Sequence, residues 1–243
     1  MVHILKSYFS INKLLAFALG IVLLASCKPE KVKVYSSFYQ YYPLKVGNYL
    51  IYHVDSIKYF KSLLTVKPPD TIRYQIMDSV QSKFIDGTGQ IAFRIQESRR
   101  SSSSNPWQII RAFSRSINDR NGQQVDGNNR LIKMIFPVSQ NASWNPDLYN
   151  TTDSAHLLNA KYTQVHMPYF NQTLNFDSTV LVQLQADSNL ITYIVYNERY
   201  AAQIGLICLE HDSVFNIIDS IGAPPAIEGF RYKQTLLDYG PKK

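Results

Sequence analysis

Residues 71–97 read TIRYQIMDSVQSKFIDGTGQIAFRIQE and contain the pattern that decides the fold class. Thr71–Ile76 alternates polar with apolar residues, which is typical of a strand with one buried face. Further along, the loop Asp86–Gly89 separates Ser82–Ile85 from Gln90–Glu97. Because glycine adopts positive φ without a steric penalty, glycines in a short loop favour a β-hairpin. The stretch therefore predicts an antiparallel pair of strands.

Strand-like segments recur along the rest of the chain. The chain has 17 Tyr and 12 Phe, which suit pleated, half-buried surfaces, and only Ser154–Ala160 leaves room for a short helix. Parallel strands need long crossovers, usually helices, so about ten strands with short connections predict an all-β, mainly antiparallel fold. Besides those above, we expect strands at Asn48–Asp55, Trp107–Ile117, Arg130–Val138, Thr179–Ala186, Leu190–Asn197, Gln203–Glu210 and Gly229–Tyr239.

The N-terminal segment has the composition of an export signal. Lys6 and Lys13 precede the uncharged run Leu14–Ser26, LLAFALGIVLLAS, and a basic region followed by an apolar region is the layout of a secretory signal peptide. The apolar run is shorter than the roughly 20 residues that a membrane-spanning helix needs. We therefore predict that residues 1–26 are a signal peptide.

The end of the apolar run resembles the lipobox of bacterial lipoproteins, since small residues precede a cysteine in Leu24-Ala25-Ser26-Cys27. The resemblance implies that Cys27 becomes the first residue of the mature protein and carries a diacylglycerol thioether and an acyl chain. Several acyl chains hold a protein stably on a membrane. Lys28 stands where enterobacterial lipoproteins that stay in the inner membrane have Asp, so the analogy favours the outer membrane. The alternative is an ordinary signal peptide with a chance cysteine.

Charge and cysteine content bound the mature protein. Without residues 1–26, which contain Lys6, Lys13 and no acid, 23 Lys and Arg remain against 18 Asp and Glu. This mild excess does not indicate a nucleic-acid partner. Cys208 has no partner for a disulfide once Cys27 is lipidated, and its apolar surroundings predict a small buried hydrophobe. We divide the mature chain into a lipidated tether, residues 27–42, and a single antiparallel β domain, residues 43–243.

Motifs for catalysis or cofactor binding are not found in the sequence. The mature chain's four histidines (His53, His156, His166 and His211) lack the short spacings of zinc motifs. Neither a Gly-x-Ser-x-Gly nucleophile elbow nor a glycine-rich phosphate loop followed by lysine occurs. We predict no metal and no cofactor, although two carboxylates on different strands could still form a glycosidase-like pair.

Three short blocks carry a second resemblance. The blocks are Tyr42–Tyr49 (YPLKVGNY), Phe136–Val138 with Trp144-Asn145, and Glu198–Ala201 leading into Ile204–Ile207. They look like uncharacterised Bacteroidota lipoproteins, and the last is similar to the YAPGVGLV hairpin of exported bacterial proteins with strongly curved antiparallel sheets. This resemblance implies a half-barrel or open barrel like that of periplasmic lipoprotein carriers, and it carries no activity with it. In the hairpin, Ala202-Gln203 replaces Pro-Gly, which leaves the turn geometry open.

The same blocks contain the residues with the clearest structural roles. Gly47 and Gly205 suit a turn and a close backbone approach. We interpret Tyr200 and Trp144 as core anchors, because aromatic side chains contribute large buried areas.

Two weaker signals remain. Residues 94–133 hold eight basic side chains against three acids (Glu97, Asp119 and Asp126), which indicates either a basic sheet face for anionic partners or a solvated face that discourages aggregation. Asp followed by Ser or Thr and a small or aliphatic residue resembles a Bacteroidota O-glycosylation motif, although turn-to-strand boundaries favour the same residues. These triplets begin at Asp55, Asp70, Asp78, Asp153, Asp177, Asp212 and Asp219.

Taken together, the sequence favours a non-enzymatic, membrane-anchored β domain that binds an apolar ligand or an envelope protein in the concavity of its sheet. One alternative is a hydrolase acting on envelope glycan or lipid, which would place two carboxylates face to face in a cleft. The other is a purely structural envelope subunit whose own side chains fill the concavity.

Overall fold

The computed structural model describes residues 39–60, 68–150, 159–217 and 226–241. They belong to one compact unit and form a single antiparallel sheet. The all-β, curved-sheet prediction is confirmed, and no α-helix occurs in these residues. The strands are β1 (Tyr49–Tyr59), β2 (Asp70–Ile85), β3 (Ile91–Arg100), β4 (Gln108–Ile117), β5 (Asn121–Asp126), β6 (Asn129–Ile135), β7 (Ser143–Trp144), β8 (Ala160–Phe170), β9 (Asn175–Ser188), β10 (Thr192–Ala201), β11 (Gly205–Ile217) and β12 (Ala226–Gly240).

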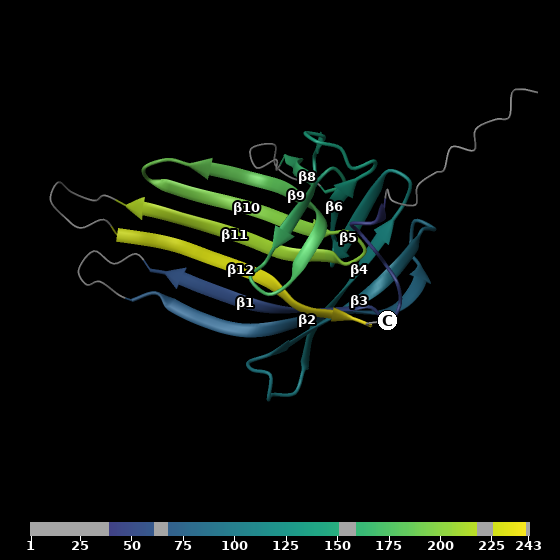
Figure 1. The fold of residues 1–243 in the computed structure, drawn as a ribbon, viewed down its shortest axis with the longest axis horizontal. Coiled ribbons are helices and arrows are strands. Elements are labelled where there is room, and N and C mark those ends of the chain that lie inside the picture. The colour runs from purple at the N-terminus through teal and green to yellow at the C-terminus, as the bar shows by residue number, and fades with distance from the viewer. Residues whose placement is uncertain (1–38, 61–67, 151–158, 218–225, 242–243) are drawn as a thin grey trace, which may run out of the picture. The chain divides into compact units, whose positions relative to one another are not determined.

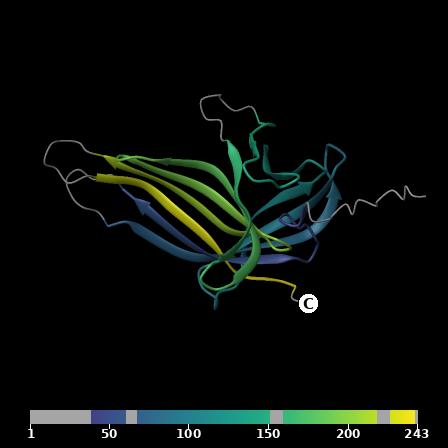
Figure 2. The ribbon, with the colours of Figure 1, turned by 45° about the horizontal axis from the view of Figure 1, so that its top comes forward.

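The strand order makes the sheet nearly continuous around its interior. It runs β6-β5-β4-β3-β2-β1-β12-β11-β10-β9-β8-β7, so the first and last long strands, β1 and β12, lie side by side at its centre. In Figures 1 and 2 the long strands bend together and the sheet curls so that β6 approaches β7 and β8. The result is a nearly closed, barrel-like sheet.

One half of the interior is filled by large side chains. Tyr52, Val54 and Leu236 project from the central strands β1 and β12 and are fully buried. The buried Tyr52 hydroxyl donates a hydrogen bond to the Leu206 carbonyl oxygen, 3.0 Å away. Such polar aromatic residues fill volume while their hydroxyl groups find partners. The same cluster contains Tyr41, Tyr42, Ile76, Ile132, Met134, Trp144, Tyr162, Val180, Val182, Tyr200 and Ile207.

The two edges of the sheet, β6 and the segment around β7 and β8, are joined by side chains and a loop and not by paired strands. We call this junction the seam. The free edge of β6 presents alternate backbone groups, which cost free energy if they are buried without partners. The Tyr162 hydroxyl accepts from the Ile135 amide (2.9 Å) and donates to its carbonyl (2.7 Å). The Trp144 indole N–H donates to the Ile132 carbonyl at 2.9 Å, and the Ile132 amide donates to the Pro146 carbonyl. These contacts join β6 to the segment around β7 and β8.

The turn end of the β8–β9 hairpin crosses over the sheet and reaches β12 (Figure 1). Asn171, in the turn between the two strands, donates to the Leu236 carbonyl of β12 at 2.8 Å. Cys208 on β11 is buried and interacts with Tyr169 of β8. Burial raises the pKa of the Cys208 thiol, so the prediction of a small buried hydrophobe is confirmed.

The strand prediction missed β5, β7 and β8. Asn121-Gly122 has the composition of a turn, yet it begins β5. The glycine has a packing role there, because a Cβ on Gly122 would lie 2.8 Å from the Tyr42 ring. In β8, Gln164 and His166 have positive φ and the register with β9 shifts, which hides the alternating pattern. The helix expected at Ser154–Ala160 lies outside the described residues except for its end, where Ala160 begins a strand.

The start of the domain also differs from the expectation. Tyr41 and Tyr42, which we assigned to the tether, are buried in the core. The Tyr42 hydroxyl donates to the Gln123 carbonyl at 3.0 Å, so the packed domain includes the end of the 27–42 segment. Residues 1–26, predicted to be a signal peptide, and Cys27 lie outside the described residues. In the described part of the chain, no helix has the length and hydropathy to cross a bilayer.

Candidate functional site

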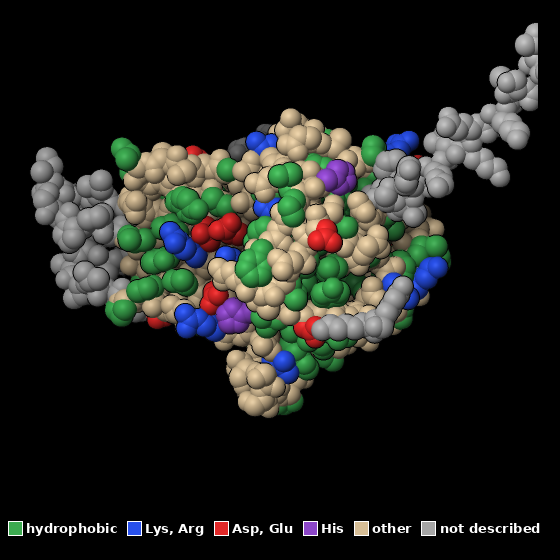
Figure 3. Space-filling view, viewed as in Figure 1, with side chains coloured by type: hydrophobic (Ala, Val, Ile, Leu, Met, Phe, Trp, Pro, Cys, Tyr) green, Lys and Arg blue, Asp and Glu red, His purple; other side chains and the backbone are tan. Residues whose placement is uncertain are grey.

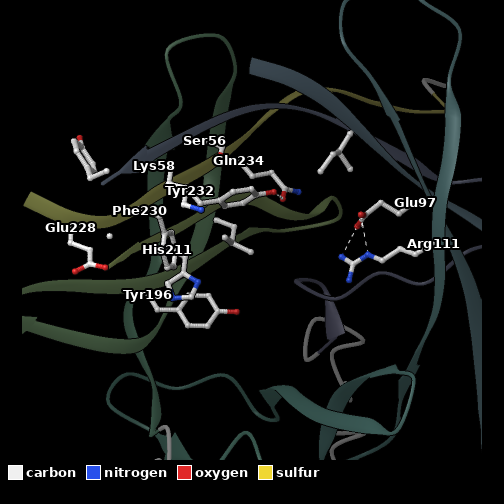
Figure 4. Close-up of a pocket in the computed structure, with 14 residues that line it drawn as sticks. Ser56, Lys58, Glu97, Arg111, Tyr196, His211, Glu228, Phe230, Tyr232 and Gln234 are labelled. Atoms are coloured by element: carbon white, nitrogen blue, oxygen red, sulfur yellow. Dashed lines mark hydrogen bonds and ion pairs between the residues drawn. The ribbon is translucent and has the colours of Figure 1, made fainter. Parts of the chain in front are cut away.

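The half of the interior away from the packed core holds a cavity with a volume of about 710 Å³. Its walls come from β1, β2, β3, β4, β10, β11 and β12, so residues distant in sequence meet there (Figure 4). Apolar and aromatic side chains form much of the surface, and these are Tyr59, Ile76, Tyr196, Leu209, Phe230 and Tyr232.

A three-ring stack lines one wall of the cavity. His211 of β11 stacks on Tyr196 of β10, with centroids 4.5 Å apart and planes 14° apart. Phe230 of β12 meets the other side of His211 edge-on at 4.9 Å. Burial lowers the pKa of His211, and the nearby Asp212 carboxylate opposes that shift only in part. The imidazole is therefore neutral at pH 7, and the wall is an aromatic surface without charge.

The charged side chains of the cavity lie at two ends of it. At one end, Glu97 accepts two hydrogen bonds from Arg111, at 3.0 and 2.7 Å, and Arg111 also contacts Asp126. Figure 4 shows Glu228 and Lys58 at the opposite end, away from Glu97. The two glutamates thus do not face each other, and Glu97 already has both carboxylate oxygens engaged.

A buried polar cluster lies where the cavity meets the packed core. Glu198 of β10 is almost wholly buried and pairs with Lys133 of β6. It also accepts hydrogen bonds from Tyr200 at 2.6 Å and Tyr196 at 3.2 Å. Burial disfavours its charged form, but the Lys133 ammonium and these donors outweigh that effect and lower the pKa of Glu198. The cluster links the ring wall of the cavity to the core.

Most residues singled out from the sequence have structural places. Tyr200 and Trp144 are buried in the core, which confirms their interpretation as anchors. Gly47 has φ +90° in a turn and Gly205 has φ +102°, but a Cβ on Gly205 would meet only ordinary contacts. In the hairpin, Gln203 takes φ +66°, so this turn uses glutamine where the resembling motif has glycine.

The basic segment 94–133 is neither a basic binding face nor a simple solvated face. Four of its eight cations form ion pairs with acids: Arg111 with Glu97, Arg115 with Asp78, Arg130 with Asp86, and Lys133 with Glu198. Arg99 and Arg100 lie over the rings of Tyr74 and Trp107. Figure 3 shows Lys and Arg dispersed among other side chains on the visible face. Counting charge along the sequence missed this pairing, because three of the four acids, Asp78, Asp86 and Glu198, lie outside the segment.

The described Asp-Ser and Asp-Thr triplets lie within strands, at Ser56 (β1), Thr71 and Ser79 (β2), Ser178 (β9) and Ser213 (β11). The Ser178 hydroxyl is 2.7 Å from the Tyr41 hydroxyl, which also contacts Nδ1 of His166 at 2.7 Å. Of these hydroxyl-bearing residues only Thr71 is exposed. The triplets at Asp153 and Asp219, like His156, lie outside the described residues.

No family model, curated protein or solved structure matches the chain.

Sequence reasoning did not identify the residues that line the cavity. His211 was considered only as a metal ligand, and Glu97 only as one acid in a basic segment. Both lie on strands that the sequence predicts, Gln203–Glu210 extended by one residue and Gln90–Glu97. The strand register could have identified them, because the pairing of β11 with β12 places His211 opposite Tyr232, another residue of the cavity wall.

Proposed function

We propose that this protein is a non-enzymatic, membrane-anchored binding module that holds a neutral, largely apolar ligand in the cavity at the open half of its barrel. The observation that carries the proposal is the contrast within one sheet, whose interior is filled on one side and hollow on the other. A volume of about 710 Å³ is ample for a drug-sized molecule.

The charges around the cavity support a ligand without net charge. Lys58 and Arg111 balance Glu97 and Glu228, and His211 is neutral because burial lowers its pKa. A ligand with a full unpaired charge would have to be desolvated without a dedicated counter-ion, which costs several kcal/mol. Apolar rings and chains of a ligand can instead pack against the Tyr196–His211–Phe230 wall and Leu209.

The carboxylate arrangement favours binding over hydrolysis. A glycosidase-like mechanism needs two carboxyl groups on either side of one bond, with separations of roughly 5 to 9.5 Å and one group free to donate a proton. Here Glu97 is held by Arg111, and Glu228 lies at the far end of the cavity (Figure 4). A purely structural subunit has no need of a cavity this large.

The binding test uses a neutral apolar fluorophore, phenylnaphthylamine, which brightens when it leaves water. Ser56 lines the cavity, so Ser56→Trp places a large ring inside it. We expect the purified protein to bind the probe saturably and Ser56→Trp to weaken binding at least tenfold. Ile57→Trp, on the next residue of β1 and absent from the cavity wall, is the matched control. Equal binding by Ser56→Trp, or no saturable binding by the unmodified protein, would reject the cavity as the site.

The anchoring proposal rests on the lipobox resemblance at Cys27. In Cys27→Ala the thiol that accepts the diacylglycerol is missing, so metabolic fatty-acid labelling should disappear and the precursor should stay uncleaved. Intact mass of the mature protein is the second measurement. A mature chain with unmodified Cys27, or undiminished label in Cys27→Ala, would show that the anchor is not on this residue. Surface proteolysis of intact cells then distinguishes a surface-facing from a periplasmic domain.

A further inference from the structure

Gln234 of β12 is a polar residue set deep in the wall of the cavity of about 710 Å³. It is 7% exposed, whereas Phe230, earlier on the same strand, is 37% exposed. The strand register places Val54 of β1 and Leu209 of β11 opposite Gln234, so its neighbours on both adjacent strands are apolar. Figure 4 shows Gln234 in the middle of the residues that line the cavity. The cavity therefore presents an amide group in an apolar part of its wall.

The two ends of this amide have different surroundings. Its oxygen, Oε1, accepts a hydrogen bond from the Tyr232 hydroxyl at 3.1 Å. Burial raises the pKa of Tyr232, so the hydroxyl keeps its proton and donates at neutral pH. The amide nitrogen, Nε2, finds no acceptor among the described residues, and it is not one of the partnerless side-chain atoms that are closed off from the surface. Nε2 of Gln234 is thus a donor that a molecule in the cavity can reach.

The carboxylates of the cavity do not take up this donor. Both oxygens of Glu97 accept from Arg111, at 3.0 and 2.7 Å. Glu228 lies at the other end of the cavity (Figure 4). The acceptor for Nε2 of Gln234 is therefore one that the ligand brings.

We propose that the ligand of this cavity is a neutral ring compound with a carbonyl group whose oxygen accepts a hydrogen bond from Nε2 of Gln234. The inference rests on the proposed function, because it names the ligand class for the same cavity. A purely apolar ligand that filled the cavity would leave the amide nitrogen buried without an acceptor, which weakens binding. A carbonyl oxygen only accepts, so this donor satisfies it while the ring packs against the Tyr196–His211–Phe230 wall.

Other polar groups suit this position less well. A carboxylate would bring a charge into the cavity, and Arg111 is already paired with Glu97 and Asp126. A hydroxyl group would bring a proton that needs an acceptor of its own, whereas Oε1 of Gln234 already receives the Tyr232 hydroxyl. A neutral carbonyl matches the one donor that the wall leaves open.

The test compares two ligands of the same shape, 2-acetylnaphthalene and 2-isopropenylnaphthalene, in which a CH₂ group replaces the carbonyl oxygen. Saturation-transfer NMR titrations of the purified protein give both dissociation constants, and comparing their ratio between variants removes the difference in hydrophobicity. Gln234→Met keeps the size of the side chain and removes Nε2, so it should weaken ketone binding by about fivefold or more relative to the hydrocarbon. Gln96→Met, the same substitution on β3 at a residue absent from the cavity wall, should leave the ratio unchanged.

An infrared measurement on the unmodified protein decides the matter if Gln234→Met does not fold. The carbonyl stretch of bound, carbon-13-labelled 2-acetylnaphthalene should lie at the lower frequency of a hydrogen-bonded ketone. An unchanged ratio in Gln234→Met, or a stretch at the frequency found in hexane, would overturn this inference and leave the cavity as an apolar binding site. If neither compound bound saturably, this inference and the proposed function would fail together.

Discussion

The two ends of the central strands differ although they share one backbone ladder. On β12, Leu236 is 0% exposed and packs in the core, whereas Phe230, earlier on the same strand, is 37% exposed and lines the large cavity. On β1, Tyr52 is buried, whereas Lys58 is exposed at the cavity. Both ends pair with the same neighbours, β1 with β12 and β2. Backbone pairing therefore holds the strands together along their length, and side-chain filling distinguishes a packed half from a hollow half, which we propose binds the ligand.

The largest expected difference between the halves concerns buried charge. Lys133→Met leaves Glu198 buried without its cation, which should lower the free energy of unfolding by about 3–5 kcal/mol. Lys58→Met at the open end removes a cation with no ion pair among the described residues, and it should change stability by less than about 0.5 kcal/mol. Urea denaturation of both variants measures this contrast. Equal losses would show that the two halves contribute alike.

A smaller contrast tests the side-chain seam. Tyr162→Phe removes the hydroxyl that satisfies both backbone groups of Ile135, and should cost about 1–3 kcal/mol. Tyr193→Phe, on a half-exposed ring at the open end, should cost less than about 0.5 kcal/mol. Thermal and urea unfolding give the values. If Tyr162→Phe left the free energy of unfolding unchanged, the Tyr162 hydrogen bonds at the seam would not be what closes the barrel.

The smallest contrast is a pH dependence at the open end. Burial lowers the pKa of folded His211 below its ordinary value of about 6.5, so the unfolded chain binds the proton more tightly than the folded chain does. The stability that neutral His211 contributes is present above about pH 6.5 and is lost as the pH falls through the lowered pKa. His211→Gln should therefore lose less stability than the unmodified protein between pH 7 and pH 5. If the free energy of unfolding changed with pH in the same way for both proteins, the stability would not depend on a lowered pKa of His211.

The sequence predicts the fold class because most strands carry an alternating pattern bounded by turn residues. Strand β3 and the β2–β3 loop follow that expectation closely. Strand β8 does not, because bulges and the positive φ of Gln164 and His166 interrupt its alternation. Gly122 misleads for another reason: it is required by the approach of the Tyr42 ring, a contact between segments far apart in the chain.

The candidate site is less predictable than the fold, since its residues meet only through strand register. Tyr196, His211 and Phe230 come from three strands, and no local motif joins them. The ion pairs of Arg111, Arg115 and Lys133 likewise depend on acids contributed by other strands. The anchor prediction at Cys27, by contrast, rests on a contiguous motif, which is why sequence alone could state it.

Hydrogen–deuterium exchange with and without phenylnaphthylamine tests most directly whether the open half is the binding half. Segments 56–59 and 228–234 line the cavity, so their amides should exchange several-fold more slowly once the probe is bound. Segments 50–54 and 236–239 belong to the packed half, and their exchange rates should be the same with and without the probe. Slowing confined to the packed segments, or an equal change in both halves, would contradict the division of this barrel into a stabilising half and a binding half.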